Sequence, residues 1–357
     1  MQMVGKSPKR LVDGRIAAVR SGGARLEDVA RGAGVATSTV SRALSGHPGI
    51  SAATRAVVQK AAAELGYRLP AQGRKVRKSA TRIVGVVIGA LHNRFMTVLL
   101  EHLHDALREA GYHVTLLIDS MNEAASLQTL RPLIDGFLDG LIIATATLDS
   151  PVVAELKRRG IPLVLVVRTV DEPGVDTVEI DNCHAAADAA RHLYELGHRN
   201  IGLVMGPRNT STSRDRGQGA LEWLERQGIA VNALPVLYGD YTSESGYSLT
   251  VSLLGRDDPV TAIIAGNDTI AMGVLDAAKR RGVKVPDQLS VIGFDDIPLA
   301  GSPLLALTTI RQPVESMARI AARRLVERMQ GDLFSPANHD VLPIQLIQRE
   351  STGPVRK

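Results

Sequence analysis

The chain has 357 residues, 45% of them hydrophobic and 22% charged, which is the composition of a soluble globular protein of two or three domains. Its net charge of +5 is unevenly divided, because residues 1–82 hold 16 Lys and Arg against 4 Asp and Glu, a net of +12, whereas the rest carries −7. This asymmetry indicates a basic module for a polyanion joined to a separate body. No apolar run approaches the roughly 20 residues of a membrane span, and the N-terminus lacks the apolar segment of a secretory signal. The single cysteine, Cys183, excludes an internal disulfide framework and Cys-based zinc fingers, so we expect a cytoplasmic protein without a membrane partner.

Three short helical patterns follow a basic arm. Residues 1–25 are rich in glycine and basic side chains, and we expect them to be mostly disordered, with a short helix around residues 12–20. From Leu26 onward, apolar residues recur at helical spacing, a second helix is predicted over Thr37–Leu44, and Ser51 can cap a third helix. These patterns define residues 26–66 as a small helical domain.

The character of the chain changes after a basic linker. Residues 67–82 contain six Lys or Arg and no acid. Beyond them, in residues 83–357, apolar and β-branched runs alternate with helical stretches. The runs are IVGVVI, HVTLLI, GLIIAT, PLVLVV, IGLVMG, TAIIAG and LSVIG, and the helical stretches include Phe95–Ala110, His184–Leu196, Ser213–Gln227 and Asp268–Arg281. Continuous apolar strands joined by helices predict parallel sheets covered on both faces, and about ten strands predict two doubly wound lobes with a ligand crevice at the carboxyl ends of the strands.

The segment LEDVARGAGVATSTVSRALSG has the layout of a helix-turn-helix, with two short helices and a glycine-containing turn. The start of such a recognition helix enters the major groove, where Thr37, Ser38 and Thr39 can reach base edges and phosphates. Arg42, one turn further on, can make two hydrogen bonds to a guanine, and Ser41 beside it belongs to the same candidate site. Short Ala-rich helix pairs also occur in proteins that bind no DNA, but the net charge of +12 and the basic linker favour DNA binding.

Several separated blocks carry a family resemblance. They are LEDVARGAGVATSTVSRAL, TRAVVQKAAAELGY, VEIDNCHAAADAARHLYELGHRNIGLVMG, AGNDTIAMGVLDAAKRRGVKVPDQLSVIGFDD, LTTIRQPVESMARIAARRL and QREST. From about Leu26 to its end, the chain resembles transcription regulators of the lactose-repressor (LacI/GalR) family. The resemblance implies an N-terminal helix-turn-helix headpiece followed by a two-lobed, periplasmic-binding-protein-like, doubly wound α/β effector domain. It also implies a homodimeric, ligand-responsive repressor that reads a pseudo-palindromic double-stranded operator.

The resemblance further implies three crossovers between the lobes, near Ile180, Thr309 and Asp340. The expected lobes are therefore residues 83–180 plus 310–340, and 181–309 plus 341–357. By position, Thr37 and Ser38 take the first two base-reading places of the recognition helix and Arg42 the basic place after them. Arg25 and Leu26 lie where the family touches the DNA backbone.

The linker departs from the family pattern of a proline followed by an Ala-rich hinge helix with a leucine wedge. Pro70 comes one residue late, Gly73 interrupts the run of helix formers, and Val76 stands where the leucine is expected. Glycine costs about 1 kcal/mol of helix propensity, and valine is a smaller and stiffer wedge. Lys75 could compensate by contacting phosphate, as could Arg77 and Lys78. We expect a hinge that becomes ordered only on specific DNA, with a shallow kink.

The resemblance also implies three ligand-contacting positions in the cleft between the lobes. The matching residues are Arg216 in RDRGQG, Asn267 in GNDTIAMG and Asp295 in GFDD. These three residue types suit the recognition of a polyol. Arginine donates hydrogen bonds in a fork, aspartate accepts them, and asparagine does both. The alternatives are surface ion pairing for Arg216 and helix capping for Asn267.

Two further positions bear on the effector. The strand PLVLVV ends in Val167 and Arg168, where many relatives place Asp and then Arg or an aromatic residue. Losing that carboxylate while keeping Arg168 and Arg216 would make the cleft more cationic, so we hypothesise a sugar acid or sugar phosphate rather than a neutral sugar. The alternative is that Val167 is sheet core and Arg168 points outward. Phe95 sits where relatives place aromatic cleft residues, with core packing as its alternative.

Enzymatic interpretations have little support. The sequence contains no G-x-S-x-G, P-loop or H-E-x-x-H motif, and we expect no catalytic residue, cofactor or metal site. The histidines at 102, 104, 184 and 192 lack metal-ligand spacing, and solvated helix faces account for them. A transport solute-binding protein would need an export signal and no basic headpiece, and an enzyme on a doubly wound fold would need a nucleophile or cofactor motif.

Overall fold

The computed structural model describes residues 26–44, 49–65, 80–119, 123–331 and 336–355. They belong to two compact units, a headpiece and a body, which divide between Arg74 and Lys75 within the expected linker. Arg25, Lys75 and Val76, the basic arm and the expected hinge helix lie outside the described residues. No helix among the described residues is long and apolar enough to cross a membrane.

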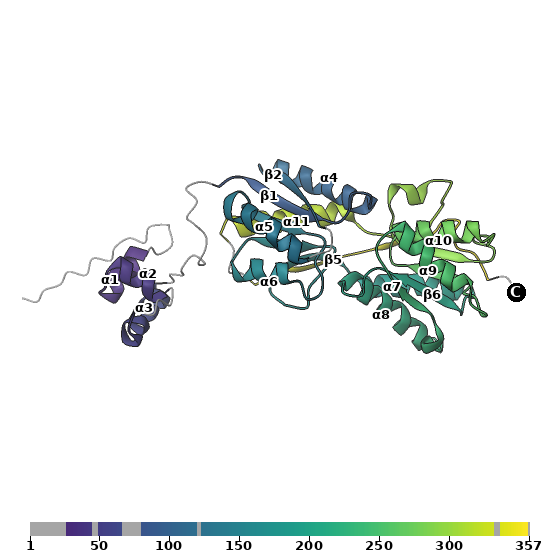
Figure 1. Ribbon diagram of the computed structural model, residues 1–357, viewed down its shortest axis with the longest axis horizontal. Coiled ribbons are helices and arrows are strands. Elements are labelled where there is room, and N and C mark those ends of the chain that lie inside the picture. Colours follow the sequence, from purple (N-terminus) through teal and green to yellow (C-terminus); the bar gives the residue numbers. More distant parts are fainter. Residues whose placement is uncertain (1–25, 45–48, 66–79, 120–122, 332–335, 356–357) are drawn as a thin grey trace, which may run out of the picture. The chain divides into compact units, whose positions relative to one another are not determined.

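The headpiece is a three-helix unit (Figure 1), with α1 at Leu26–Ala33, α2 at Thr37–Leu44 and α3 at Ala52–Glu64. Its core is formed by one fully buried valine from each helix, Val29, Val40 and Val58. Gly34 has a φ of +66°, a left-handed conformation that ends α1 and opens the turn to α2. The Ser51 hydroxyl accepts a hydrogen bond from the Thr54 amide at 3.2 Å and caps α3, as the sequence predicted.

The body contains two six-stranded sheets, one in each lobe. The sheet of lobe 1 is parallel throughout, in the order β11 (His339–Leu342), β5 (Asp176–Ile180), β4 (Leu163–Val166), β3 (Gly140–Ile143), β1 (Ile83–Ile88) and β2 (His113–Ile118). The sheet of lobe 2 has the order β12 (Gln345–Ile347), β10 (Thr308–Arg311), β9 (Ser290–Asp295), β8 (Ala262–Ala265), β6 (Ile201–Met205) and β7 (Val236–Tyr238). Only β12 is antiparallel to its neighbour, at the edge of the second sheet.

Helices cover both faces of the lobe 1 sheet, which is why its central strands are buried from end to end. The helices α4 (Arg94–Glu109) and α11 (Val314–Met329) pack together on one face, and α5 (Glu123–Gly136) and α6 (Pro151–Arg158) cover the other. In Figure 1, α11 is drawn in the yellow of the chain's end yet lies with the elements of lobe 1. The first lobe is therefore built from two distant parts of the sequence.

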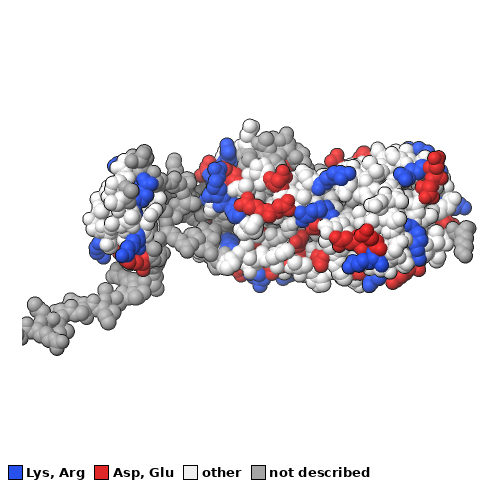
Figure 2. All heavy atoms as spheres, turned by 90° about the horizontal axis from the view of Figure 1, so that it is seen from below, with Lys and Arg blue, Asp and Glu red and all other residues white. Residues whose placement is uncertain are grey.

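Lobe 2 is built around two close helix pairs. The helix α7 (Asn182–Glu195) packs against α8 (Ser211–Arg226), and α9 (Ser243–Leu254) packs against α10 (Asp268–Arg280). Two short 3-10 helices, Val231–Ala233 and Pro298–Gly301, complete the lobe. On the face shown in Figure 2, basic and acidic side chains are interspersed over the body rather than segregated.

The chain passes between the lobes three times. The first passage follows Ile180, the second uses residues 312–313 and the third uses residues 343–344. The last two lie about three residues beyond the positions expected near Thr309 and Asp340, because β10 continues to Arg311 and β11 continues to Leu342. These passages place the carboxyl ends of β4, β8 and β9, and the residues that follow them, around the space between the lobes.

Candidate DNA interface and interlobe cavity

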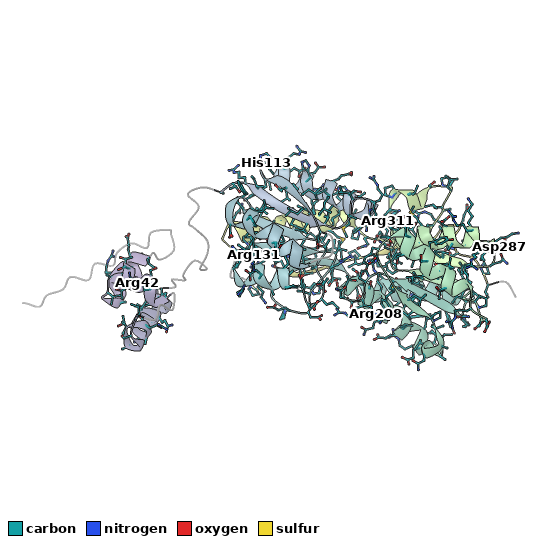
Figure 3. The ribbon with its side chains drawn as sticks, in the orientation of Figure 1. Arg42, His113, Arg131, Arg208, Asp287 and Arg311 are labelled. Carbon is teal, nitrogen blue, oxygen red and sulfur yellow. The ribbon has the colours of Figure 1, made fainter. Side chains whose placement is uncertain are left out.

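The helix α2 presents a polar face without acidic side chains. Val40 and Ala43 are buried against the headpiece core, whereas Thr37, Ser38 and Arg42 are exposed. Figure 3 shows Arg42 on the headpiece. Thr39, Ser41 and Leu26 are half-buried, and Leu26 also packs against the core of the unit. Hydroxyl groups followed by a guanidinium one turn later form a surface that can donate to base edges and phosphates.

A cavity between the two lobes gathers the residues expected to contact a ligand. Its lining is formed by Asn93, Phe95, Met96, Val167, Arg168, Thr212, Arg216, Tyr241, Asn267 and Asp295. All five candidate effector residues are in this set, although they come from five separate segments of the chain. Three of the residues that sequence reasoning did not select, Asn93, Thr212 and Tyr241, add polar groups to it.

Arg216 is held rigidly at the lobe 2 side of the cavity. Its side chain is buried, its Nε donates to Asn182 Oδ1 at 2.9 Å and its Nη1 donates to the Gly266 carbonyl at 2.5 Å. The guanidinium lies 4.3 Å from the centroid of the Phe294 ring, a cation–π distance. Surface ion pairing is therefore the wrong interpretation of Arg216.

Arg168 reaches the same cavity from lobe 1. The side chain is buried, and its Nη1 donates to the Thr145 carbonyl at 3.1 Å. Burial lowers the pKa of Arg168, and the nearby Arg216 lowers it further, while Tyr241 and Asp119 act in the opposite direction. An arginine nevertheless stays charged in a protein. Because the buried Arg168 lines the cavity, the outward alternative is wrong for it, whereas Val167 is both part of the lobe 1 core and part of the lining.

Two buried carboxyl groups of lobe 2, Asp295 in the cavity lining and Asp268 outside it, act on each other. Asp295 ends β9 with a φ of +112°, a strained backbone for a non-glycine residue, and its Oδ1 accepts from Gln312 Nε2 at 2.6 Å. Burial raises the pKa of Asp295 to about 6, although Arg216 and the Gln312 hydrogen bond oppose the shift. Asp268 accepts from the Thr309 hydroxyl at 2.6 Å, and burial together with the Asp295 charge raises its pKa well above the usual range.

Tyr241 is a further lining residue of the cavity, contributed by the loop after β7. Its hydroxyl lies 2.7 Å from the Thr212 hydroxyl, 2.8 Å from that of Ser213 and 3.4 Å from that of Thr210. Arg168 lies 5.1 Å from the centroid of its ring. Burial would raise the pKa of Tyr241, but the Arg168 and Arg216 charges outweigh burial and lower it. No spacing in GDYTSESG marks this tyrosine, because its inward direction depends on the loop after β7.

Asn267 and Phe95 each serve two roles. Asn267 Oδ1 accepts from the Ile270 amide at 2.9 Å and caps α10, while the residue also lines the cavity. Phe95 is buried in the lobe 1 core and borders the cavity as well. Asn267 thus both caps a helix and lines the cavity, and Phe95 both packs in the core and lines the cavity, because α10 and α4 begin at the cleft.

Direct contacts between the lobes border the cavity, whose volume is about 30 Å³. The Thr169 amide donates to Ser211 Oγ at 2.9 Å, the Leu148 amide donates to the Asn209 carbonyl at 2.8 Å, and Arg214 pairs with Asp171 at 2.8 Å. A space of this size holds about one or two water molecules. A larger ligand therefore requires the lobes to separate or lining side chains to move.

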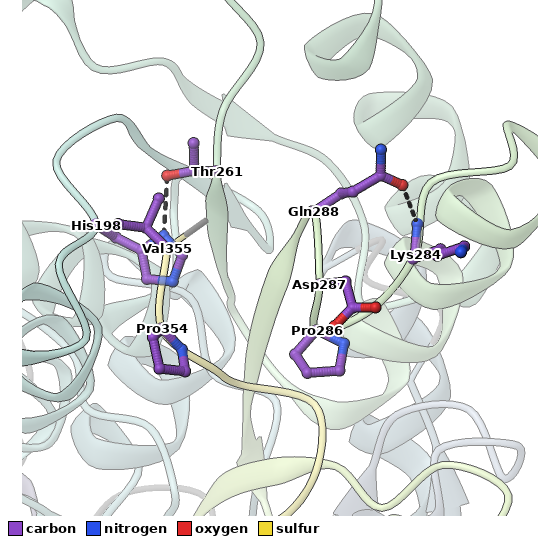
Figure 4. A pocket seen from close by; sticks show the side chains of 8 residues that line it. All are labelled: His198, Thr261, Lys284, Pro286, Asp287, Gln288, Pro354 and Val355. Atoms are coloured by element: carbon purple, nitrogen blue, oxygen red, sulfur yellow. Dashed lines mark hydrogen bonds between the residues drawn. The ribbon is translucent and has the colours of Figure 1, made fainter. Parts of the chain in front are cut away.

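A second cavity, of about 500 Å³, lies within lobe 2 (Figure 4). His198 lines it, but its Nδ1 contacts the Thr261 hydroxyl at 2.9 Å and its Nε2 contacts Ser290 and the Gly353 carbonyl at 3.0 Å. Burial lowers the pKa of His198. Both ring nitrogens are thus used in joining the C-terminal segment to the sheet, which makes His198 a structural residue.

One histidine departs from the solvated-surface expectation. His192 is buried in α7, and its Nε2 lies 2.9 Å from the Thr352 hydroxyl, because α7 packs under the C-terminal segment. Among the residues that the structure describes, no group of three or more His, Cys, Asp and Glu side chains could hold a metal ion. Burial, followed by the Asp215 charge, raises the pKa of the Cys183 thiol to about 11, which disfavours the reactive thiolate.

The helix-turn-helix of the headpiece and the cavity between the two lobes of the body are the features of a DNA-binding protein with a ligand-binding domain. Residues 25–69 match the model of the lacI family of bacterial regulatory proteins, and residues 190–352 match that of the periplasmic binding protein-like domain. The chain is 36% identical to the HTH-type transcriptional repressor CytR of Escherichia coli K12 over 330 residues, covering 92% of this chain and 96% of CytR. It is 32% identical to catabolite control protein A of Priestia megaterium, covering 91% and 98% of the two chains.

Solved structures of transcription regulators are also similar to this chain. The transcriptional regulator CelR–cellobiose complex has a TM-score of 0.69 at 31% identity, covering 92% of this chain and 99% of that one. The lac repressor dimer bound to operator and the anti-inducer ONPF has a TM-score of 0.68 at 26% identity, covering 93% and 100%. The chain belongs to the lacI family of bacterial regulatory proteins. Its relatives are transcription regulators and not enzymes.

Proposed function

We propose that the chain is a homodimeric transcriptional repressor whose affinity for a pseudo-palindromic operator is set by a small molecule bound between its lobes. The observation that carries this proposal is the convergence of Phe95, Arg168, Arg216, Asn267 and Asp295 on one interlobe cavity. The relatives add support, since one is named a repressor, another was solved with cellobiose and a third was solved as a dimer on operator DNA.

The DNA-reading residues of this proposal lie on α2. Thr37, Ser38 and Thr39 contact base edges and phosphates in the major groove, Ser41 supports them, and Arg42 reads a guanine. Leu26 and Arg25 approach the DNA backbone at the edge of the headpiece. Lys75 and Val76 contact phosphate and the minor groove from the hinge. Arg25, Lys75 and Val76 enter from the sequence alone, because they lie outside the described residues.

The effector proposed is a sugar and, within that class, a sugar acid or sugar phosphate. Asn267 and Asp295 provide the mixed donors and acceptors that hydroxyl groups need. Arg168 and Arg216 both line the cavity, and Val167 stands beside them in place of a carboxylate. Two guanidinium groups facing one ligand favour an anion.

The mechanism is thermodynamic linkage. An effector that prefers one arrangement of the lobes shifts the population of that arrangement, and with it the affinity of the dimer for operator. Coupling of this kind is typically about 1–3 kcal/mol, or roughly a 5- to 150-fold change in affinity.

A thermal-shift screen of sugars, sugar acids and nucleobases, with each hit retested for its effect on operator binding, tests the effector site. Calorimetric titration with D-gluconate and D-glucose then compares a matched acid and neutral sugar, and tighter binding of the neutral sugar would refute the anionic class. A hit whose binding survives Arg216→Leu, with operator affinity unchanged, would place the ligand elsewhere.

The headpiece proposal is tested with Arg42→Ala. We expect it to reduce the preference for operator over random DNA by about 1–3 kcal/mol while affecting non-specific binding little. Electrophoretic mobility shifts on both DNAs measure this ratio. Equal weakening on both would assign Arg42 to phosphate contacts instead.

A further inference from the structure

A buried polar chain leads from the protein surface to Arg216. Glu179 lies on β5 with its side chain 10% exposed, and His339 on β11, 60% exposed, contacts Glu179 Oε1 through Nε2 at 2.7 Å. Asn182, the first residue of α7, directs its Nδ2 toward Glu179 Oε2 at 3.5 Å and toward the Ile180 carbonyl at 3.2 Å. The Asn182 Oδ1 accepts from Arg216 Nε at 2.9 Å. The Glu179 carboxylate is therefore separated from the Arg216 guanidinium by one buried amide.

The charges around Glu179 are few. His339 faces it from β11 and Asp215 acts on it from α8, while β4 beside it supplies the apolar run Leu163–Val166. The arginines of α11 nearest this sheet pair with other acids, Arg324 with Asp340 and Arg328 with Asp176. Burial raises the pKa of Glu179, the contact with His339 lowers it, and the Asp215 charge raises it. Glu179 therefore binds a proton more readily than an exposed glutamate does.

We propose that Glu179, held by His339 and linked to Arg216 through Asn182, is a specificity-determining residue of the interlobe cavity, because the charge on its carboxylate sets how strongly Arg216 attracts an anionic effector. This inference rests on the proposed function. The ionised carboxylate compensates part of the Arg216 charge, and its protonation removes that compensation.

The effect is electrostatic rather than steric. Asn182 stays oriented when Glu179 is neutral, because its shorter contact is with the Ile180 carbonyl. Arg216 also keeps its bond to the Gly266 carbonyl at 2.5 Å. Position is preserved while the potential at the cavity changes, so an anionic ligand responds and a neutral one does not.

Asp295 has a pKa of about 6 and lies in the lining of the same cavity. Protonation of either Asp295 or Glu179 therefore affects how ligand affinity depends on pH in the wild-type protein. The difference between wild type and Glu179→Gln gives the contribution of Glu179 alone. In His339→Ala, Glu179 loses the partner that lowers its pKa. The Glu179 part of the titration should then move to higher pH.

Ligand binding is measured with D-gluconate and D-glucose by calorimetry from about pH 5 to 8. We expect D-gluconate affinity to rise roughly threefold to tenfold more in wild type than in Glu179→Gln as the pH falls, the effect of one partly screened unit charge. The D-glucose affinity should not depend on the substitution. Glu222→Gln, on the same helix as Arg216, removes an equal charge from an exposed site and is the matched control.

A second readout needs no ligand. The ¹⁵N shift of Arg216 Nε, assigned through Arg216→Lys, should titrate in wild type, lose part of its amplitude in Glu179→Gln and shift its midpoint upward in His339→Ala. An identical titration in wild type and Glu179→Gln would overturn the inference. Absence of binding by any sugar at any pH would instead refute the proposed function, and the Arg216 titration would still decide the electrostatic link.

Discussion

Tyr241 lines the cavity from lobe 2. Its hydroxyl contacts Thr212 and Ser213 on α8, and its ring lies against Gly206, where a Cβ atom would stand 2.2 Å from the ring. Only glycine at position 206 leaves room for this ring. The cluster combines three hydroxyl groups within a space bordered by two arginines, so the tyrosine hydroxyl has a defined place.

Removing that hydroxyl is the first prediction. In Tyr241→Phe, the buried Thr212 and Ser213 hydroxyls lose a hydrogen-bond partner, which typically costs about 1–3 kcal/mol. We expect the free energy of unfolding, measured in urea, to fall by this amount. Tyr238→Phe, a half-buried tyrosine on β7, is the control. An unchanged stability in Tyr241→Phe would show that the hydroxyl cluster contributes nothing net.

Asp295 yields a prediction about pH. Its folded-state pKa of about 6 exceeds the value of roughly 3.9 for an unfolded aspartate. The folded protein therefore binds this proton more tightly, and the resulting stability is present below about pH 4 and is lost as the pH rises through about 6. Asp295→Asn retains the acceptor for Gln312 and removes the titration.

We therefore expect Asp295→Asn to be more stable than wild type by about 2–3 kcal/mol above pH 7, with a difference that vanishes toward pH 4. Urea unfolding across this range measures it. Equal stability of the two proteins at pH 7.5 would contradict the raised pKa of Asp295.

At the scale of residues, the charged side chains that line the cavity could be predicted from the sequence, but Tyr241 in the same lining could not. Asn267 and Asp295 stand near the ends of predicted strands and Arg216 in the helix that follows another, so their convergence followed from the topology. Tyr241 and the Glu179–His339 pair could not be found this way. Their roles depend on contacts between segments that are 28 and 160 residues apart, which no local pattern encodes.

At the scale of elements, the close approach of α7 and α8 depends on one glycine. A Cβ atom on Gly219 would lie 2.1 Å from the Cys183 carbonyl oxygen, which belongs to backbone and cannot move aside. Gly217, on the same helix, has its nearest neighbour at 3.6 Å, the Tyr238 hydroxyl. The two glycines thus form a matched pair for testing helix packing.

We expect Gly219→Ala to destabilise the protein by about 1–3 kcal/mol, because the two helices must separate. Gly217→Ala should be neutral or stabilising by about 0.5–1 kcal/mol, since alanine is the better helix former. Thermal unfolding of both variants gives the comparison. Equal effects at the two positions would mean that α7 and α8 do not pack this closely in solution.

The strands of the body differ in how well the sequence predicts them. The seven apolar runs predicted from the sequence all fall on strands, and six of them lie inside their sheets, where strands covered on both faces are continuously apolar. The strands β5, β7, β10, β11 and β12 were not among them. The strand β5, DTVEI, contains two acids, Asp176 and Glu179. Their partners, Arg328 and His339, come from the far end of the chain. The short edge strands β7, β11 and β12 and the strand β5, with its buried ion pair, lack the long apolar run that marks the seven predicted strands.

At the scale of the whole molecule, the contacts between the lobes oppose opening of the cavity. The Arg214–Asp171 pair stands beside the hydrogen bonds of Thr169 and Leu148 to lobe 2, outside the cavity lining. The side chains of Arg214 and Asp171 are 42% and 64% exposed, so the pair stabilises the closed arrangement only modestly. Its removal changes the balance between open and closed lobes without touching a ligand.

We predict that Asp171→Asn raises the population of the open arrangement by up to about fivefold, the equivalent of an exposed ion pair worth at most about 1 kcal/mol. Amide hydrogen exchange at Thr169 and Leu148 reports this opening directly, because both amides donate across the lobes. Their exchange should accelerate by the same factor, because exchange at these amides follows the population of the open arrangement. The control is Glu172→Gln, which breaks the neighbouring pair with Lys157 inside lobe 1. Equal exchange rates in the two variants would show that the Arg214–Asp171 pair does not hold the lobes together.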